Sequence, residues 1–212
     1  KVIAHSDVPA PFETVSPFYA LIEFEQTSEA ELERAMELFE ACMEEGWVED
    51  GAISQSISQA ENLWKLREDL SETLSQWKPY KNDISVSVSQ MPAFIEKVDA
   101  LVAEQYPDFE IVWFGHIGDG NIHLNILKPD DLSVEAFTER CGGVSKQVAA
   151  LIQSFSGSVS AEHGVGLLKK DYLGYTRTET ELQLMRQIKQ VFDPKGIMNP
   201  GKLVDIVDSS GI

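Results

Sequence analysis

The 212-residue sequence predicts an α+β fold in which a mostly antiparallel sheet is covered by helices. Segments in which apolar residues alternate are interleaved with segments in which apolar residues recur at helical spacing. Within residues 111–127, two strand-like segments flank Asp119-Gly120, a dipeptide typical of a tight antiparallel hairpin. The chain has no repeat of fixed period, so a repeat architecture is not expected.

In the first third of the chain, the pattern predicts one strand followed by two helices. Residues 18–26 (FYALIEFEQ) alternate in the manner of a strand. Ser28 and Glu31 form a capping box ahead of the first helix, and Ser58 with Glu61 repeats this device ahead of the second. The apolar seam of the second helix consists of Leu63, Leu66, Leu70 and Leu74.

The rest of the chain predicts a strand, a hairpin and three helices. Residues 84–88 alternate as a strand, and Ser89 is expected to open a helix. The later elements are a hairpin over 111–127, a long helix over 133–155 and a helix over 178–192. Residues 193–202 (DPKGIMNPGK) contain two prolines and two glycines, so no regular structure is expected there.

The composition is strongly acidic, with 35 acidic and 17 basic residues and a formal net charge of −18. Such a charge disfavours nucleic acid and anionic membrane surfaces as partners, although a few local cations can still attract an anionic substrate. No run of eighteen apolar residues predicts a membrane span, and no signal-peptide pattern is present. The only two cysteines, Cys42 and Cys141, are predicted to be buried free thiols. We therefore expect a protein of the bacterial cytoplasm or the mitochondrial matrix that is not secreted.

The most informative segment is the hairpin sequence FGHIGDGNIHLNI, residues 114–126. If Asp119 and Gly120 form a two-residue loop, His116 pairs with His123 across the two strands. The Cβ atoms of this pair would then be roughly 4.5–5.5 Å apart on one face of the sheet. The isoleucines and the leucine of the second strand would point to the opposite, core-facing side.

Two opposed imidazoles suit a divalent metal, and a third ligand can come from SAEHGVG, residues 160–166, which contains Glu162 and His163. Two histidines and a carboxylate leave a coordination position open for substrate, as in catalytic zinc sites. From the spacing alone, the alternative stays open that His116 and His123 are hydrogen-bonded surface residues of a structural hairpin.

Together, GHIGDGNIHLN and SAEHGVG resemble the C-terminal domain of the FAD-linked oxidases of the vanillyl-alcohol oxidase superfamily, the flavin-dependent D-2-hydroxyacid dehydrogenases. The resemblance extends from the first predicted strand to DPKGIMNPGK. It implies a fold with ferredoxin-like elements. It also implies that residues 1–17 connect two domains and that residues 18–212 bind substrate and metal. An N-terminal domain outside this chain would hold most of the FAD, so the chain alone is expected to be inactive.

The resemblance also implies a role for each residue of the two motifs. His116, His123 and Glu162 match the metal ligands of the family, with Zn²⁺ expected and Mn²⁺, Co²⁺ or Fe²⁺ as alternatives. His163 matches the catalytic base and contacts substrate, and Asn125 matches a further substrate contact.

Within this family, the chain is most similar to the D-2-hydroxyglutarate dehydrogenases, because WKLR (64–67) and YKND (80–83) match their motifs. Arg67 and Ser71 are spaced to share one helix face. With Lys81, they present a guanidinium, a hydroxyl and an ammonium, which suit the second carboxylate of the substrate. A member of this family has threonine at the position of Ser71, so the hydroxyl is kept here and a methyl is lost.

The expected reaction is oxidation of D-2-hydroxyglutarate to 2-oxoglutarate, with reduction of FAD and transfer of electrons to a further acceptor. In the same scheme, Asn199 lies near the domain junction as a weak candidate for an FAD contact. One alternative is a D-lactate or glycolate dehydrogenase of this family, in which Lys81 has no such role. Two others are a non-catalytic metal-binding subunit that docks a flavoprotein, and a metal-dependent hydrolase.

Overall fold

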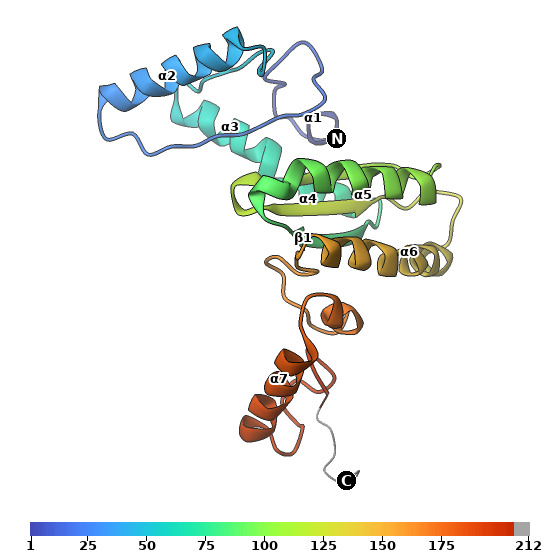
Figure 1. Ribbon diagram of the computed structural model, residues 1–212. Helices are drawn as coiled ribbons and strands as arrows, with labels where there is room; N and C mark the ends of the chain where they lie inside the picture. The colour runs from blue at the N-terminus through green and yellow to red at the C-terminus, as the bar shows by residue number, and fades with distance from the viewer. Residues whose placement is uncertain (206–212) are drawn as a thin grey trace. The chain divides into compact units, whose positions relative to one another are not determined.

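The computed structural model describes residues 1–205, whose Cα atoms cluster into two compact units (Figure 1). The first unit is Lys1–Gln76, and the second begins at Trp77. No helix among the described residues combines the length and the apolar character needed to cross a bilayer.

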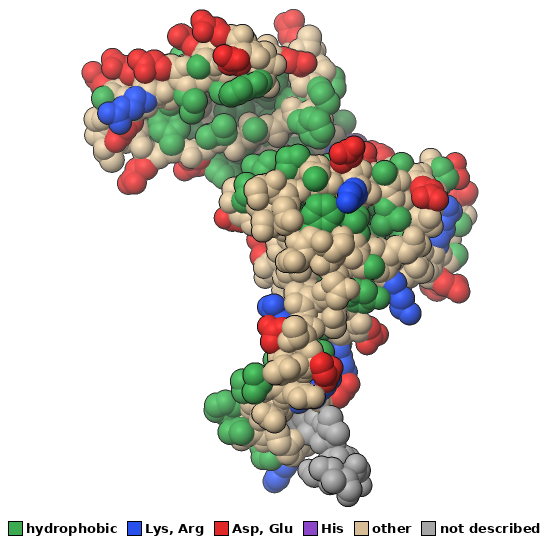
Figure 2. Space-filling view, viewed as in Figure 1, with side chains coloured by type: hydrophobic (Ala, Val, Ile, Leu, Met, Phe, Trp, Pro, Cys, Tyr) green, Lys and Arg blue, Asp and Glu red, His purple; other side chains and the backbone are tan. Residues whose placement is uncertain are grey.

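The first unit is helical. Its helices are α1 (Val2–His5), α2 (Glu29–Glu44), α3 (Ile57–Glu68) and α4 (Leu70–Ser75). The predicted capping box of α2 is confirmed, since Oε2 of Glu31 accepts a hydrogen bond from the backbone N–H of Ser28 at 2.8 Å. Acidic side chains line the outer face of this helix in Figure 2, as expected for a solvated helix face.

The strand predicted over residues 18–26 is wrong, because this segment has no regular secondary structure. Alternation favours a strand only where a neighbouring strand satisfies its backbone and a core covers its apolar face. Residues 1–76 contain no strand with which this segment could pair. The large side chains of Phe18 and Ile22 are accordingly about four-fifths exposed, at 81% and 80%.

The helix predicted from Ser58 differs in its start and its continuity. Ser56, two residues earlier, is the N-cap, and its Oγ accepts from the backbone N–H of Gln59 at 3.2 Å. The helical run is interrupted at Asp69, which separates α3 from α4. Aspartate is a poor residue for a helix interior because its side chain competes for backbone hydrogen bonds. Arg67 therefore lies in α3 and Ser71 in α4.

The second unit contains the predicted antiparallel sheet. Its strands are β1 (Tyr80–Ser85), β2 (Ile111–His116) and β3 (Asn121–Ile126), in the order β1-β3-β2 with both pairings antiparallel. Helices α5 (Met91–Gln105) and α6 (Val134–Ser154) run along this sheet (Figure 1). The core forms between their apolar side chains and one face of the sheet, which confirms the α+β class.

Two boundaries near β1 differ from the prediction over 84–88. The strand begins four residues earlier, at Tyr80, because residues 80–83 also pair with β3. Ser89 does not start the next helix: a 3₁₀ turn, η1 (Val88–Gln90), precedes α5, whose first turn contains Pro92. Proline suits a helix start, since the first N–H groups need no intrahelical acceptor.

The C-terminal elements follow the sequence pattern. The long helix α6 begins at its N-cap Ser133, whose Oγ accepts from the backbone N–H of Ala136 at 3.1 Å. The 3₁₀ helix η3 (Lys170–Tyr175) leads to α7 (Glu179–Phe192), which has a capping box at Thr178. Residues 193–202 contain neither helix nor strand, as predicted.

The hairpin forms where predicted, but its register differs by two residues. A 3₁₀ turn, η2 (Ile117–Asp119), and Gly120 at φ +68° make the loop, so His116 pairs with Asn121 and Phe114 pairs with His123. A shift of one residue would turn every side chain to the other face, whereas a shift of two preserves the faces. His116 and His123 consequently still share one face, as diagonal neighbours rather than as a direct pair.

The two free cysteines are expected to differ in reactivity. Cys141 is fully buried in the core, and this burial raises the pKa of its thiol to about 11. The prediction that Cys42 is buried is wrong, because this residue on α2 is only partly buried. Because the thiolate is the reactive form, a thiol reagent at pH 8 should label Cys42 quickly and Cys141 only after denaturant is added. Peptide mapping by mass spectrometry checks this, with Cys42→Ser as the control. Equal labelling rates in the folded protein would contradict it.

Candidate metal centre

The face of the sheet opposite the core carries several polar side chains. Strand alternation places them at matching positions of the three strands. One row of this face contains Asp83, His123 and Phe114, which are cross-strand partners. The next row contains Asn121, with His116 beside it on β2. The core-facing residues of β3 are Ile122, Leu124 and Ile126, as the alternation predicted.

A glycine-rich segment after α6 runs beside the end of β1 and completes the site. Ser85 and Ser158 exchange backbone hydrogen bonds of 3.1 and 2.8 Å, which tie the segment to the strand. Beyond this bridge, the backbone N–H groups of Glu162 and His163 donate to Oδ2 of Asp83 at 3.0 and 2.9 Å. These bonds place the SAEHGVG motif directly over the hairpin histidines.

The carboxylate of Glu162 lies among three imidazoles. Its Oε1 is 3.0 Å from Nε2 of His123 and 3.7 Å from Nε2 of His163, and its Oε2 is 3.9 Å from Nδ1 of His116. The rings of His123 and His163 stack at a centroid distance of 5.4 Å, and those of His116 and His123 are 6.0 Å apart. The structure thus brings together four residues that the two motifs singled out.

The chemistry of these donors fits a divalent cation. Single ligand atoms of Asp83, His123, Glu162 and His163 lie within 4.8 Å of one another, and the predicted ligand His116 is not part of this set. Two of these four donors are carboxylates, and Nζ of Lys169 lies 3.6 Å from Oδ2 of Asp83. Imidazole nitrogen with carboxylate oxygen is a donor set preferred by Zn²⁺ and similar metals. His123 is buried, whereas Glu162 and His163 are about half exposed, so one side is open to a further ligand.

Asp83 is the residue of this cluster to which the sequence analysis assigned no role. Burial alone raises the pKa of Asp83, but hydrogen bonds from the backbone N–H groups of His163 and Glu162, together with the Lys169 charge, outweigh it and hold the pKa below its ordinary value. The sequence feature that could have identified Asp83 is its position among strand-forming residues, since strands disfavour aspartate. The predicted strand began at Ile84 and therefore left Asp83 outside.

The predicted substrate contacts are divided between the two units. Asn125 is buried on the polar face, and its amide nitrogen donates to the carbonyl oxygens of His123 and Val112 at 3.3 and 3.4 Å. Lys81 is its cross-strand partner on β1. Arg67 and Ser71 belong to the first unit, so their convergence with Lys81 stays a prediction.

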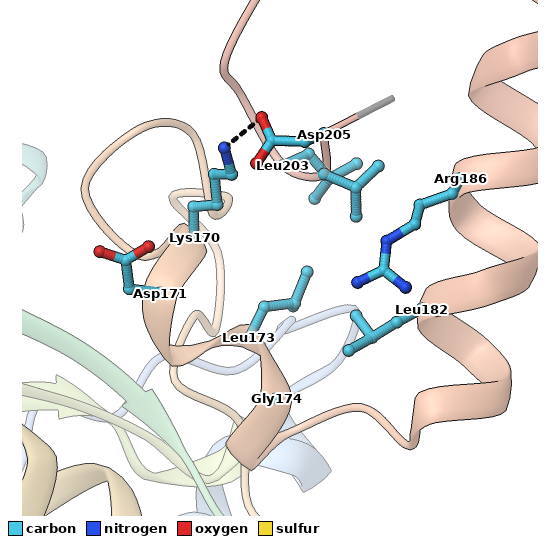
Figure 3. A pocket seen from close by; sticks show the side chains of 9 residues that line it. Lys170, Asp171, Leu173, Gly174, Leu182, Arg186, Leu203 and Asp205 are labelled. Atoms are coloured by element: carbon cyan, nitrogen blue, oxygen red, sulfur yellow. Dashed lines mark hydrogen bonds and ion pairs between the residues drawn. The ribbon is translucent and has the colours of Figure 1, made fainter. Parts of the chain in front are cut away.

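Asn199 lies in the loop after α7, where its Oδ1 accepts from Nζ of Lys202 at 3.1 Å, and its contact with FAD stays a prediction. Elsewhere, a shallow hollow of about 270 Å³ lies between η3 and α7 (Figure 3). Its two cations are already paired, Lys170 with Asp205 and Arg186 with Glu179. No predicted site residue lines this hollow, so it is separate from the candidate metal centre.

Comparison with known proteins gives one family over almost the whole chain. The family described as "FAD linked oxidases, C-terminal domain" matches residues 1–203. The D-2-hydroxyglutarate dehydrogenase of Stutzerimonas stutzeri is 60% identical over 203 residues, which cover 96% of this chain and 44% of that protein. The protein of the same name from Xanthomonas citri pv. viticola is 52% identical over 208 residues, which cover 98% and 44%.

A more distant relative is the mitochondrial D-2-hydroxyglutarate dehydrogenase of Bos taurus, 39% identical over 193 residues, which cover 89% of this chain and 34% of that protein. The chain spans less than half the length of these relatives. The family match covers residues 1–203, which include both motifs, so this chain belongs to the C-terminal domain family of the FAD-linked oxidases.

Proposed function

We propose that this chain is the substrate- and metal-binding part of an FAD- and metal-dependent dehydrogenase that oxidises D-2-hydroxyglutarate to 2-oxoglutarate. The observation that carries the proposal is the convergence of His116 and His123, on the polar face of the sheet, with Glu162 and His163 from the loop after α6. The identity of 60% to a protein named D-2-hydroxyglutarate dehydrogenase supports the choice of substrate.

His116, His123 and Glu162 are the proposed ligands of the metal. A divalent cation held there supplies Lewis acidity, which lowers the pKa of a bound hydroxyl group. Zn²⁺ suits two imidazoles and a carboxylate, and Mn²⁺, Co²⁺ and Fe²⁺ accept the same donors. The partly exposed side of Glu162 and His116 is where the substrate carboxylate and hydroxyl would approach.

His163 is the proposed general base. Its ring stacks beside His123 and is about half exposed, so it can reach a hydroxyl bound at the open side of the cluster. It would take the proton of the C2 hydroxyl, and bound FAD would supply the acceptor for the hydride from C2. The hydrogen bond from its backbone N–H to Asp83 fixes the position of this residue. Turnover would require a separate electron acceptor.

The far carboxylate of the substrate is proposed to bind Lys81, Arg67 and Ser71, with Asn125 as a contact nearer the metal. The cations at one end and the metal at the other make the length of the substrate a criterion for selection. FAD is proposed to bind mainly to an N-terminal domain of the intact protein. The intact protein is proposed to be located in the bacterial cytoplasm or the mitochondrial matrix, in keeping with the bacterial and mitochondrial relatives.

The test is to measure metal content and steady-state kinetics of the intact protein with D-2-hydroxyglutarate, D-malate and D-lactate. We expect near-stoichiometric metal, bound FAD and the highest kcat/KM for D-2-hydroxyglutarate. Preference for D-lactate or glycolate would favour the alternative within the family. Bound metal without any oxidation would favour a non-catalytic subunit, and cleavage of esters or peptides without flavin would favour a hydrolase.

The Lys81→Ala variant of the intact protein tests the far-carboxylate site. We expect kcat/KM for D-2-hydroxyglutarate to fall about tenfold to a hundredfold, the loss typical of a charge-assisted hydrogen bond, while kcat/KM for D-lactate changes less than about threefold. Lys146→Ala is the matched control, because Lys146 is an exposed lysine on α6, which packs against the other face of the sheet. An unchanged preference for the dicarboxylate in Lys81→Ala would refute the assignment.

A further inference from the structure

Asp83 is the most deeply buried polar residue of the candidate metal centre, with only 1% of its surface exposed. Its Oδ2 already accepts two backbone hydrogen bonds, from Glu162 and His163. Its Oδ1 is buried and has no hydrogen-bond partner among residues 1–205. A buried carboxylate oxygen without a partner is costly, so this atom requires an explanation.

The unpartnered oxygen faces a ring nitrogen of His123. Oδ1 of Asp83 is 3.7 Å from Nδ1 of His123, whereas Oε1 of Glu162 is 3.0 Å from Nε2 of the same ring. The imidazole therefore lies between two carboxylates, with one at each nitrogen. Since Glu162 is itself a proposed ligand, Nε2 is the nitrogen that faces the metal position and Nδ1 is the nitrogen that faces Asp83.

We propose that Asp83 is a positioning residue that accepts a hydrogen bond from Nδ1–H of His123 and thereby presents Nε2 to the metal. This inference rests on the proposed function, because it requires the metal centre. A neutral imidazole carries one proton, and a carboxylate at Nδ1 selects the tautomer whose Nε2 is free to ligate. Asp83 is thus assigned outside the ligand set, although its distance alone would admit it as a ligand.

Two further contacts agree with this role. Nζ of Lys169 is 3.6 Å from Oδ2 of Asp83 and donates to the Asp83 carbonyl oxygen at 3.3 Å, so the buried negative charge is compensated on the side away from His123. The same Oδ2 holds the backbone of Glu162 and His163. One side chain therefore orients a ligand from β3 and places a second ligand from the loop.

The test compares Zn²⁺ affinity between the intact protein and its Asp83→Asn variant, measured by competition with a chromophoric chelator after metal removal. Asparagine is isosteric and keeps an acceptor for the backbone N–H groups, but it lacks the charge that selects the His123 tautomer. We expect Zn²⁺ to bind about 10 to 100 times more weakly, as for other outer carboxylate partners of metal-binding histidines. The melting temperature of the metal-free protein is measured in parallel.

Ser158→Ala is the matched control for a loop effect. Oγ of Ser158 donates to the carbonyl oxygen of Ser160 at 2.9 Å and accepts from its N–H at 3.2 Å, within the same loop. Removing it loosens the loop without changing a group that faces His123. We expect its Zn²⁺ affinity to stay within about threefold of that of the parent protein. If Ser158→Ala weakened Zn²⁺ binding as much as Asp83→Asn does, Asp83 would act only by holding the loop, and the proposal would be overturned.

The remaining outcomes separate this inference from the proposed function. A parent protein that binds no metal would contradict the metal centre itself. A parent that binds Zn²⁺ no more tightly than Asp83→Asn would overturn only the role of Asp83. If the variant does not fold, ¹⁵N-histidine NMR of the Zn²⁺-loaded parent decides instead: we expect the proton of His123 on Nδ1, and metal on Nδ1 would refute the assignment.

Discussion

Replacing Glu162 with glutamine is expected to remove the bound metal and to lower kcat of the intact protein by about a thousandfold or more. The carboxylate lies 3.0 to 3.9 Å from a ring nitrogen of each of His116, His123 and His163, so its loss affects the whole cluster. An amide oxygen is a weaker ligand and carries no charge, and loss of metal removes several kcal/mol of transition-state stabilisation. Elemental analysis and steady-state kinetics with D-2-hydroxyglutarate measure both effects.

Glu139→Gln provides the control, because Glu139 is an exposed glutamate on α6 and its replacement changes the net charge equally. We expect this variant to keep its metal and at least about half of the parent's kcat, since it lies outside the proposed site. A Glu162→Gln protein that retained stoichiometric metal and more than about a tenth of its activity would exclude Glu162 as a ligand.

The second large effect is expected for Gly120→Ala in the hairpin loop. Gly120 has φ +68°, and an added Cβ would overlap the carbonyl oxygen of Val86. The two backbones cannot separate freely, because the N–H of Val86 donates to the carbonyl oxygen of Gly120 at 3.0 Å. Left-handed strain and the loss of this hydrogen bond together should lower the free energy of unfolding by about 2–4 kcal/mol.

Denaturant-induced unfolding measures this loss, and Zn²⁺ affinity reports its effect on the site. The turn connects the strands of His116 and His123, so metal binding should weaken together with stability. Gly118→Ala is the control within the same turn, since a Cβ there meets open space and the backbone has no positive φ. We expect its free energy of unfolding to change by less than about 1 kcal/mol. Equal losses in the two variants would show that the close approach to Val86 is not the cause.

The sequence predicted the faces of the hairpin better than its register. The period of two in a strand depends on local backbone geometry, so His116 and His123 were correctly assigned to one face. The loop length was wrong because Asp119-Gly120 also fits a longer turn, in which Gly120 alone takes the left-handed conformation. The error in register does not change which side chains face the site, since a slip of two residues leaves each side chain on its face.

Local chemistry also determined where several helices begin. The capping box at Ser28 was recognised because an N-cap acts on backbone groups within the next turn, and the helix starts predicted at residues 133 and 178 coincide with the N-caps of α6 and α7. Ser56 was missed in favour of Ser58, where two overlapping serines offered the same local signal. The family could likewise be identified from the sequence, because each of its two motifs is a contiguous run of residues.

Only the tertiary structure brought Asp83, the last residue of YKND, to the SAEHGVG motif. Asp83 has its role through hydrogen bonds to Glu162 and His163, which are about 80 positions away in sequence. Residues 18–26 show the reverse case, since their alternation predicted a strand and no neighbouring strand pairs with them in the first unit. Alternation and capping are properties of a few consecutive residues, whereas the partner of a strand or a buried carboxylate is set by the packing of distant segments.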